Sequence, residues 1–476
     1  MGNSRRDFLT LMLYGLGTAL SPGLLLSGPV FAKGKVGDVV NMTVTAGDKR
    51  LAKLDPVAWS AGAASAADVI TVDAAKSFQS ILGFGGAFTD ASCYTFNKME
   101  AGKRKTILDQ MFGNAENGLG LNVCRTCIGA SDYSRNIYSF DEGEADPDLK
   151  RFSIAHDLEY ILPVLRQARA VNPDLFLFST PWSPPGWMKS NNSMLGGNMR
   201  RHYMSSYAEY FVKFLQGYEK EGVPIQAITV QNEVDTDQDG NMPACSWPQE
   251  YEADFVRHNL GPAFAKNNIK TKIWIIDHNY NLWGRAIGEL ETQDVLKYVS
   301  GVAWHGYVGD VAKMTQVHNA FPDVDQFWTE GGPDYTDPHY GDNWCTWGKS
   351  FSGILRNWCR SLTVWNLSLD EKGKPNIGPF PCGGLVTVNS ASDAISYSGQ
   401  YYALGHFSKF VKRGARRIDS QAVIEGVDHV AFENPDGGKV LVVTNGGGER
   451  KLSVKCGDKV LELNLAKDSM ATLTWG

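Results

Sequence analysis

The sequence lacks features that several large classes of protein depend on. Its 476 residues contain 46 lysines and arginines against 52 aspartates and glutamates, a formal net charge of −6. Because nucleic-acid binding needs a basic face that neutralises phosphates, we expect no nucleic-acid partner. There is also no G-x-S-x-G nucleophile elbow and no H-E-x-x-H zinc motif. These absences argue against acyl-transfer and zinc-protease chemistry.

Two apparent cofactor motifs are incomplete. The segment "LGFGGAF" has Gly83 and Gly85 but Phe88 where a dinucleotide motif needs its third glycine, so we interpret it as tight turns. Cys124-x-x-Cys127 lies in a predicted strand, where residues three apart point to opposite faces and cannot share a metal. We expect no metal or redox cofactor. The even total of 8 cysteines permits disulfides, but their pairing cannot be predicted from the sequence.

Residues 1–32 resemble a removable twin-arginine signal peptide. Arg5-Arg6 precedes an apolar stretch, and Val30-Phe31-Ala32 provides a small-residue cleavage site. A membrane anchor is the alternative, but Gly and Pro interrupt the stretch, and no later run is long and apolar enough to span a bilayer. We predict a bacterial protein that is exported to the periplasm or beyond, with no stable membrane anchor after cleavage.

The middle of the chain alternates short apolar strands with amphipathic helices. Helical spacing is clearest at 157–171 and 203–222, where the second segment has an aromatic stripe. Eight strand–helix units favour a (β/α)8 TIM barrel over a doubly wound sheet, which no nucleotide motif supports. The candidate strands are 81–88, 119–129, 175–182, 227–233, 272–279, 302–308, 325–331 and 362–369.

Both ends of the chain have a different pattern. Residues 396–476 contain short alternating strands and tight turns, which indicate an all-β module. Residues 33–80 are also strand-like, and we expect them to pair with the C-terminal module. The predicted α/β protein therefore has a catalytic barrel at 81–395 and a side β-sandwich built from both chain ends.

Two predicted barrel strands end in glutamate. The fourth ends with Asn232-Glu233 and the seventh with Glu330, and strands four and seven face each other across a barrel mouth. Glycoside hydrolysis needs two such carboxylates, one to protonate the leaving oxygen and one to act at the anomeric carbon. Singly, each could be a surface glutamate, but the pair predicts an active site. Thirteen tryptophans and 18 tyrosines also suit stacking on sugar rings.

Several segments, in order from about Gly83 to Arg417, resemble glycoside hydrolase family 30, and most of all its glucosylceramidase branch. They are "GFGGAFTDA", "LNVCRTCIGASDYS", "TPWSPPGWMKSNNSM", "TVQNE", "WTEGG", "WNLSLDEKGKPN" and "ALGHFSKFVKRGARRI". The resemblance implies a retaining hydrolase on a (β/α)8 barrel with a side β-sandwich.

The resemblance also implies residue roles. Glu233 matches the general acid/base and Glu330 the nucleophile, with carboxyl groups about 5–5.5 Å apart. Asn232 matches a residue that binds the sugar 2-hydroxyl, and Arg125 matches an arginine that keeps the nucleophile ionised. Because Glu233 has to donate a proton, we expect its pKa to be raised.

Other residues match positions in the substrate pocket. Asp132 matches an acceptor for a sugar hydroxyl, and Asp90 matches one more weakly. Trp182 and Trp365 match aromatic walls, although core packing is the alternative. The predicted sixth strand carries two more candidates, His305 and Tyr307, and the tyrosine is placed to donate to Glu330. A lone strand histidine is as often a purely structural residue, so both interpretations of His305 stay open.

The sequence departs from the family pattern at three places. Val234 replaces the proline that usually follows the acid/base, and we expect little effect because the strand sets the carboxylate. Gly306 stands where glucosylceramidases carry a tryptophan, which leaves the aglycone preference open. Asp235, Asp237 and Asp239 imitate the start of a calcium loop, but the twelfth place is serine. A polar loop that favours further sugar units is the preferred interpretation.

The predicted function is hydrolysis of β-glucosyl linkages by a glucosylceramidase-type double displacement. The substrate is a carbohydrate or a glycolipid, and the alternatives within the family are an endo-β-1,6-glucanase or a β-xylosidase. A catalytically inactive carbohydrate-binding protein is the alternative from another class. The sequence does not indicate an oligomeric state.

Overall fold

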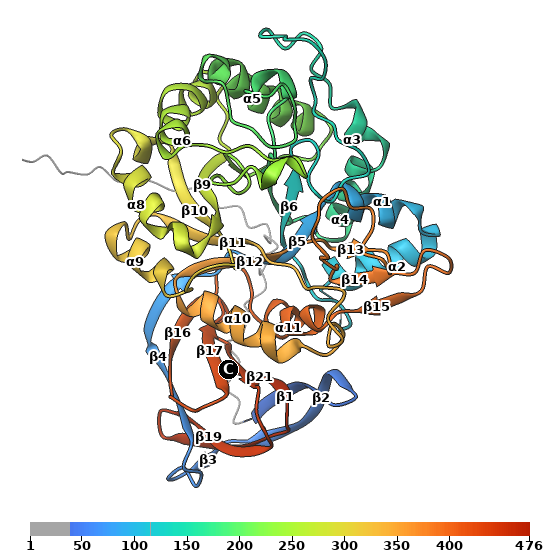
Figure 1. Cartoon of the computed structure of the whole chain (residues 1–476). Coiled ribbons are helices and arrows are strands. Elements are labelled where there is room, and N and C mark those ends of the chain that lie inside the picture. Colours follow the sequence, from blue (N-terminus) through green and yellow to red (C-terminus); the bar gives the residue numbers. More distant parts are fainter. Residues whose placement is uncertain (1–38, 115) are drawn as a thin grey trace, which may run out of the picture. The chain divides into compact units, whose positions relative to one another are not determined.

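The structure is a computed structural model that describes residues 39–114 and 116–476. Within that part, eight parallel strands close into a barrel surrounded by helices, and a ten-stranded sheet contains the strands from both chain ends (Figure 1). The predicted fold class is confirmed. No described helix combines the length and apolarity that a membrane crossing requires. The predicted signal segment, residues 1–32, lies outside the described residues, so export stays a prediction.

Each of the eight predicted barrel strands is present. They pair in chain order, and the last strand closes the barrel by pairing with the first. The fourth strand is shorter than predicted, because it ends at Thr229 and the residues up to Glu233 form a loop. The strands are β5 (Gly83–Phe88), β6 (Val123–Cys127), β7 (Phe176–Thr180), β8 (Ala227–Thr229), β9 (Lys272–Asn279), β10 (Val299–His305), β11 (Asp325–Glu330) and β12 (Cys359–Val364).

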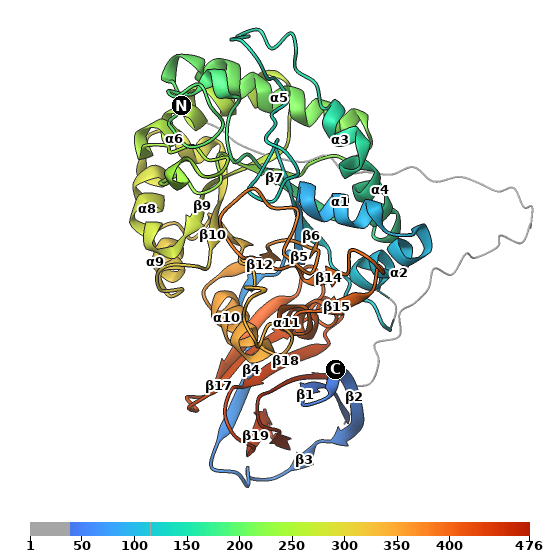
Figure 2. The same cartoon turned by 45° about the vertical axis from the view of Figure 1, so that its right-hand side comes forward.

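Helices cover the outside of the barrel (Figures 1 and 2). The aromatic stripe predicted at 203–222 lies on α5 and is buried against the barrel. The helix predicted at 157–171 is divided at Tyr160 into α3 and α4. The helices are α1 (Asp90–Lys98), α2 (Ala101–Phe112), α3 (Ala155–Glu159), α4 (Ile161–Val171), α5 (Met204–Lys220), α6 (Gln249–Phe255), α7 (Gly261–Lys266), α8 (Trp283–Glu291), α9 (Lys313–Ala320), α10 (Trp344–Arg356) and α11 (Gly399–Ser408).

The ten-stranded sheet joins the two ends of the chain. Strand β1 pairs with the last strand, β21, and β4 lies between β16 and β19, so blue N-terminal strands lie beside red C-terminal ones in Figure 1. Some of its apolar side chains form a core of their own, whereas others, such as Phe432 and Val442, pack in the core of the barrel. The strands are β1 (Val39–Ala46), β2 (Lys49–Ala58), β3 (Ser60–Ala61), β4 (Val69–Ser80), β16 (Arg416–Gln421), β17 (Val427–Glu433), β18 (Lys439–Asn445), β19 (Arg450–Cys456), β20 (Lys459–Leu465) and β21 (Ser469–Trp475).

Helix α11 connects the barrel to this sheet. Its His406 lies between Thr45 of β1 and Thr472 of β21, with nitrogen–oxygen distances of 2.9 and 2.8 Å. Burial lowers the pKa of His406 to about 3, so the imidazole is neutral. The predicted boundary at 395/396 falls before α11, in a small sheet of β13 (Ser368–Leu369), β14 (Val386–Val388) and β15 (Ile395–Tyr397), whereas the first C-terminal sandwich strand begins at Arg416.

All eight cysteines lie in the described part and are free thiols. Cys124 and Cys127 are both buried in β6, and burial raises the pKa of the Cys124 thiol to about 12. The two thiols belong to different apolar clusters of the interior.

The glycines of "LGFGGAF" lie in strand β5 rather than in tight turns, which corrects the sequence-based interpretation. A Cβ on Gly85 would overlap the Val123 carbonyl oxygen and crowd Cys124 Sγ on the neighbouring strand β6. Gly83 has a φ of 149°, where an L side chain is strained. The glycines therefore allow the backbones of β5 and β6 to approach closely.

We predict that Gly85→Ala destabilises the protein by about 3 kcal/mol, because the clash is with backbone rather than with a flexible side chain. The matched control is Gly284→Ala in α8, where an added Cβ meets nothing within 4 Å. That change should raise stability by up to about 1 kcal/mol through helix propensity. Thermal unfolding of both variants tests this, and equal melting temperatures would contradict it.

Candidate active site

A buried arginine organises the C-terminal mouth of the barrel. Arg125, on β6, is fully buried, and its Nη1 donates to Glu330 Oε2 at 2.5 Å. Its Nη2 donates to Asn232 Oδ1 and to Asp277 Oδ2, both at 2.8 Å. The guanidinium also lies over the ring of Trp182, 4.6 Å from its centroid. One cation thus orients the predicted nucleophile and a predicted substrate ligand.

Asp277, at the end of β9, is the counter-charge that the sequence analysis missed. It accepts hydrogen bonds from the hydroxyls of Thr229 and Thr329, each at 2.6 Å, and lies 3.1 Å from His305 Nε2. Burial opposes its charge, but Arg125 and His305 hold the pKa of Asp277 well below its ordinary value. Its backbone has a left-handed φ of 46°, a strained geometry of the kind found at functional sites.

Glu330 ends β11 and faces the cavity. Besides Arg125, its carboxylate accepts a hydrogen bond from the Tyr307 hydroxyl at 3.1 Å. His305 Nδ1 is 3.8 Å from Glu330 Oε1. Two hydrogen-bond donors and the nearby His305 ring therefore surround this carboxylate.

Glu233 lies beyond the end of β8, in a loop. Its φ of 56° is left-handed, and its N–H donates to the Asp277 carbonyl at 3.0 Å. The expectation that the strand sets this carboxylate is wrong, because the loop and the neighbouring strand β9 hold it instead. Glu233 Oε1 is 3.4 Å from His305 Nδ1 and 3.5 Å from His278 Nδ1, and Oε2 accepts from Gln238 Nε2 at 2.5 Å.

These partners change the proton affinity of Glu233. Burial raises its pKa, but His305, His278 and Gln238 outweigh burial and lower the pKa below its ordinary value. The expected raised pKa is therefore wrong for the protein without substrate. Burial also opposes the charge of His305, but Glu330, Asp277 and Glu233 raise the pKa of His305 to about 9. The proton of this cluster rests on the imidazole.

The two glutamates open into a cavity of about 530 Å³. Trp182 and Trp365 stack on each other in its wall, with centroids 5.0 Å apart and an angle of 20°. Asp132 also lines the cavity, and its Oδ1 has no hydrogen-bond partner in the described part of the chain. Burial, with Glu330 and Glu233, raises the pKa of Asp132 well above its ordinary value. An unsatisfied oxygen at this place suits a ligand hydroxyl.

Asp90, for which the sequence predicts a substrate-binding role, has other partners in the structure. This residue begins α1 and is not part of the cavity wall. Its Oδ1 accepts from the Arg135 N–H at 2.8 Å, and its Oδ2 accepts from the Tyr160 hydroxyl at 2.5 Å. Both oxygens already have partners, so Asp90 connects α1 to the segments that pack on it.

The acidic loop after Glu233 does not form the calcium site that its spacing imitates. Asp235 turns towards His278, 2.7 Å from its Nε2, and Asp237 accepts from the N–H of Asp239. Val234, where the family has proline, is fully buried, and its carbonyl accepts from the Trp247 N–H at 2.7 Å. The valine therefore anchors the loop.

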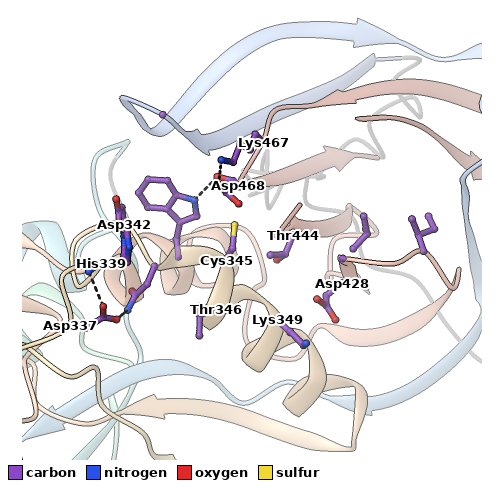
Figure 3. A pocket seen from close by; sticks show the side chains of 17 residues that line it. Asp337, His339, Asp342, Cys345, Thr346, Lys349, Asp428, Thr444, Lys467 and Asp468 are labelled. Carbon is purple, nitrogen blue, oxygen red and sulfur yellow. Dashed lines mark hydrogen bonds and ion pairs between the residues drawn. The ribbon is translucent and has the colours of Figure 1, made fainter. Parts of the chain in front are cut away.

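A second cavity, of about 990 Å³, is larger but lies elsewhere. Figure 3 shows Lys349, Asp428 and Thr444 in its wall, between α10 and strands of the sandwich. Asp468, also in this wall, accepts from Trp344 through its carbonyl, at 2.9 Å. The wall contains neither Glu233 nor Glu330. Size alone therefore does not identify the active site.

Sequence reasoning missed Asp277, His278 and Gln238. The first two end a strand that was predicted correctly, and acidic or imidazole groups at such a strand end are themselves a signal. Gln238 has no such signal, because a loop fold brings it to Glu233. The other predicted residues, apart from Asp90, lie in the cavity wall or contact Glu233 or Glu330.

A closed (β/α)8 barrel with two carboxylates facing each other at its C-terminal mouth is the architecture of a glycoside hydrolase. The family model for the "Glycosyl hydrolase family 30 TIM-barrel domain" matches residues 81–411, and that for the "beta sandwich domain" of the same family matches 414–473. The chain belongs to glycoside hydrolase family 30.

Relatives within this family differ in the activities for which they are named. An endo-1,6-beta-D-glucanase of Neurospora crassa is 34% identical over 394 residues, covering 77% of this chain and 79% of the relative. The lysosomal acid glucosylceramidase of Mus musculus is 29% identical over 405 residues, covering 80% and 78%. A solved endo-beta1,6-glucanase superposes with a TM-score of 0.84 at 30% identity, covering 92% of this chain and 100% of that one.

We predict opposite effects for Asp132→Ala and Asp90→Ala. Losing a buried hydrogen-bond partner of the substrate costs about 1–3 kcal/mol, so Asp132→Ala should lower kcat/KM on the order of 10- to 100-fold with an unchanged melting temperature. Asp90→Ala leaves buried donors unsatisfied and should cost about 2–4 kcal/mol of stability with an unchanged KM. Aryl glucoside kinetics and thermal unfolding check both, and a KM effect at Asp90 would contradict this assignment.

Proposed function

We propose that the protein hydrolyses β-glucosyl linkages with retention of configuration, through a glycosyl-enzyme on Glu330. The observation that supports this most is that one atom, His305 Nδ1, lies 3.4 Å from Glu233 and 3.8 Å from Glu330. Two oxygens so close to a common nitrogen cannot reach most of the roughly 6.5–9.5 Å separation of inverting enzymes. Close carboxylates favour direct attack rather than an intervening water.

In the first step, Glu330 attacks the anomeric carbon while Glu233 protonates the leaving oxygen. Arg125 and Tyr307 donate to the Glu330 carboxylate and direct it at the cavity. Because Asn232 Oδ1 accepts from Arg125, the amide is oriented so that its N–H group serves a sugar hydroxyl. That bond strengthens as the oxocarbenium-like transition state forms.

Glu233 needs a proton that the free protein holds on His305. Nδ1 of this imidazole is 3.4 Å from the Glu233 carboxylate. When bound substrate changes the charges around the two groups, the proton moves over this short distance and protonates Glu233. Once Glu330 is esterified, it loses the charge that raises the pKa of His305. Glu233 then acts as the base that activates water, and the second displacement releases the sugar.

Two aglycones fit the mouth beside Glu233. Thr236, Gln238 and Asn279 line it with polar side chains, which favours a further glucose unit, as in a β-1,6-glucan. Val308 and Phe380, 54% and 41% exposed, form an apolar rim that favours a lipid, as in glucosylceramide. Gly306 leaves the rim without the tryptophan of the glucosylceramidase pattern, so we place the β-1,6-glucan first.

We predict that azide rescues Glu233→Ala. Removing the acid/base slows breakdown of the glycosyl-enzyme, and azide, which needs no base, attacks it to give the β-glucosyl azide. Glu330→Gln should lose at least about 10⁴-fold in kcat and give no β-azide, since it cannot form the intermediate. Product NMR distinguishes these results. Wild-type-like activity of Glu330→Gln would rule out the assigned nucleophile, and the enzyme would then use another group.

We predict that a β-1,6-linked glucan gives the highest kcat/KM in a panel with glucosylceramide and an aryl β-xyloside. The variant Phe380→Ala separates the two aglycones, because it removes apolar surface worth about 2 kcal/mol to a lipid chain. It should therefore weaken glucosylceramide hydrolysis on the order of 10-fold or more and change glucan hydrolysis less. A preference for glucosylceramide in the wild type would reverse the order of the two candidates.

A further inference from the structure

Glu233, His278 and His305 form a group that is suited to bind a metal ion. Among the described residues, these three bring one ligand atom each to within 4.8 Å of one another. Their side chains are 12%, 10% and 0% exposed. They come from the loop after β8, from β9 and from the end of β10, so the closed barrel holds them together before any ligand arrives.

Each imidazole is oriented as in a zinc site. His278 Nε2 is 2.7 Å from Asp235, and His305 Nε2 is 3.1 Å from Asp277, so a carboxylate fixes the far nitrogen of both rings. The near nitrogens, both Nδ1, then face Glu233 Oε1. A carboxylate that orients a histidine ligand from behind is the usual support of protein-bound zinc.

Two of the three ligand spacings also match. Metal bonds of about 2.0–2.1 Å in a tetrahedron place ligand atoms about 3.4 Å apart. The two imidazole nitrogens are 3.5 and 3.4 Å from Glu233 Oε1. His305 Nδ1 has no hydrogen bond within the described residues, and His278 Nδ1 has a long one of 3.4 Å to Asn279. A metal ion therefore has to displace the proton that His305 holds, but it breaks no strong hydrogen bond at either Nδ1.

We propose that these three side chains bind Zn²⁺ or a similar transition-metal ion and that the bound ion reversibly inhibits the enzyme. Two imidazoles and one carboxylate favour Zn²⁺ or Cu²⁺ over Ca²⁺ and Mg²⁺, which prefer oxygen ligands. Glu330 and the cavity lie on the open side, where water or substrate takes the fourth position. The ion occupies the Glu233 oxygen that has to carry the proton, so hydrolysis stops. The inhibition rests on the proposed function, whereas the binding does not.

The first experiment measures binding without substrate. Wild-type protein is stripped with EDTA, and Zn²⁺ is titrated against a colorimetric chelator. We expect one tight ion per chain, and hydrolysis of an aryl β-glucoside should fall over the same range of Zn²⁺ and return with EDTA. Ca²⁺ and Mg²⁺ should leave the activity unchanged. Absence of a 1:1 site, or binding that leaves hydrolysis unaffected, would overturn the proposal.

Variants locate the site. His278→Asn and Glu233→Gln each remove a ligand and should weaken Zn²⁺ binding at least 10-fold. Asp235→Asn should weaken it about 10–100-fold, because it only supports the His278 ring. The matched control is His258→Asn, an exposed histidine 4.0 Å from Asp254, which should bind Zn²⁺ like the wild type.

Equal binding by wild type and His278→Asn, or a loss in His258→Asn, would place the ion elsewhere and overturn the proposal. The metal site and the proposed hydrolysis can be tested separately, because chelator competition measures metal binding without any turnover of substrate. A chain that binds Zn²⁺ as mapped but hydrolyses no β-glucoside would refute the proposed function and retain the metal site.

Discussion

The buried ion pair between Arg125 and Asp277 is the interaction on which the active site depends. Neither charge is accessible to water, and burying a pair of charges is favourable only when their remaining donors and acceptors are satisfied. Here that requires several strands at once. Successive strands from β6 to β11 supply the partners, namely Arg125, Thr180, Thr229, Asp277, His305 and Thr329. The pair is stable only in a closed barrel of this register, so the fold and the site specify each other.

The ion pair between Arg125 and Asp277 also gives the two glutamates, Glu233 and Glu330, different chemistry. Arg125 donates directly to Glu330, whereas Asp277 holds His305 beside Glu233. Glu330 therefore lies next to a permanent cation, and Glu233 lies next to a cation that can lose its proton. A nucleophile needs the first environment and an acid that later becomes a base needs the second. The division of roles thus follows from which strand end each glutamate occupies.

The sequence predicted the barrel and the two glutamates because both depend on local patterns. Apolar runs define strands, and a strand end identifies the residues that face a barrel mouth. The pKa of Glu233 was predicted wrongly, since it depends on imidazoles from two other strands. The place of Asp90 outside the cavity wall was not predicted for the same reason, because only the fold shows that its carboxylate accepts hydrogen bonds from Tyr160 and Arg135. The contact of Gln238 with Glu233 could not be predicted, because no sequence pattern indicates the path of its loop.

The arrangement around Glu233 also carries a chemical constraint. An imidazole that returns a proton to a carboxylate has to present a lone pair or an N–H at hydrogen-bonding distance, with its other nitrogen fixed by a carboxylate. Two such rings around one oxygen reproduce the ligand set of a zinc site, because protons and transition metals seek the same lone pairs. The protein cannot strengthen the proton supply by adding a second oriented histidine without also creating affinity for metal. His278, which Asp235 of the polar loop orients, is the second histidine that brings this affinity for metal. Loss of its carboxylate partner should therefore weaken metal binding more than it weakens proton transfer, which His305 and Asp277 carry.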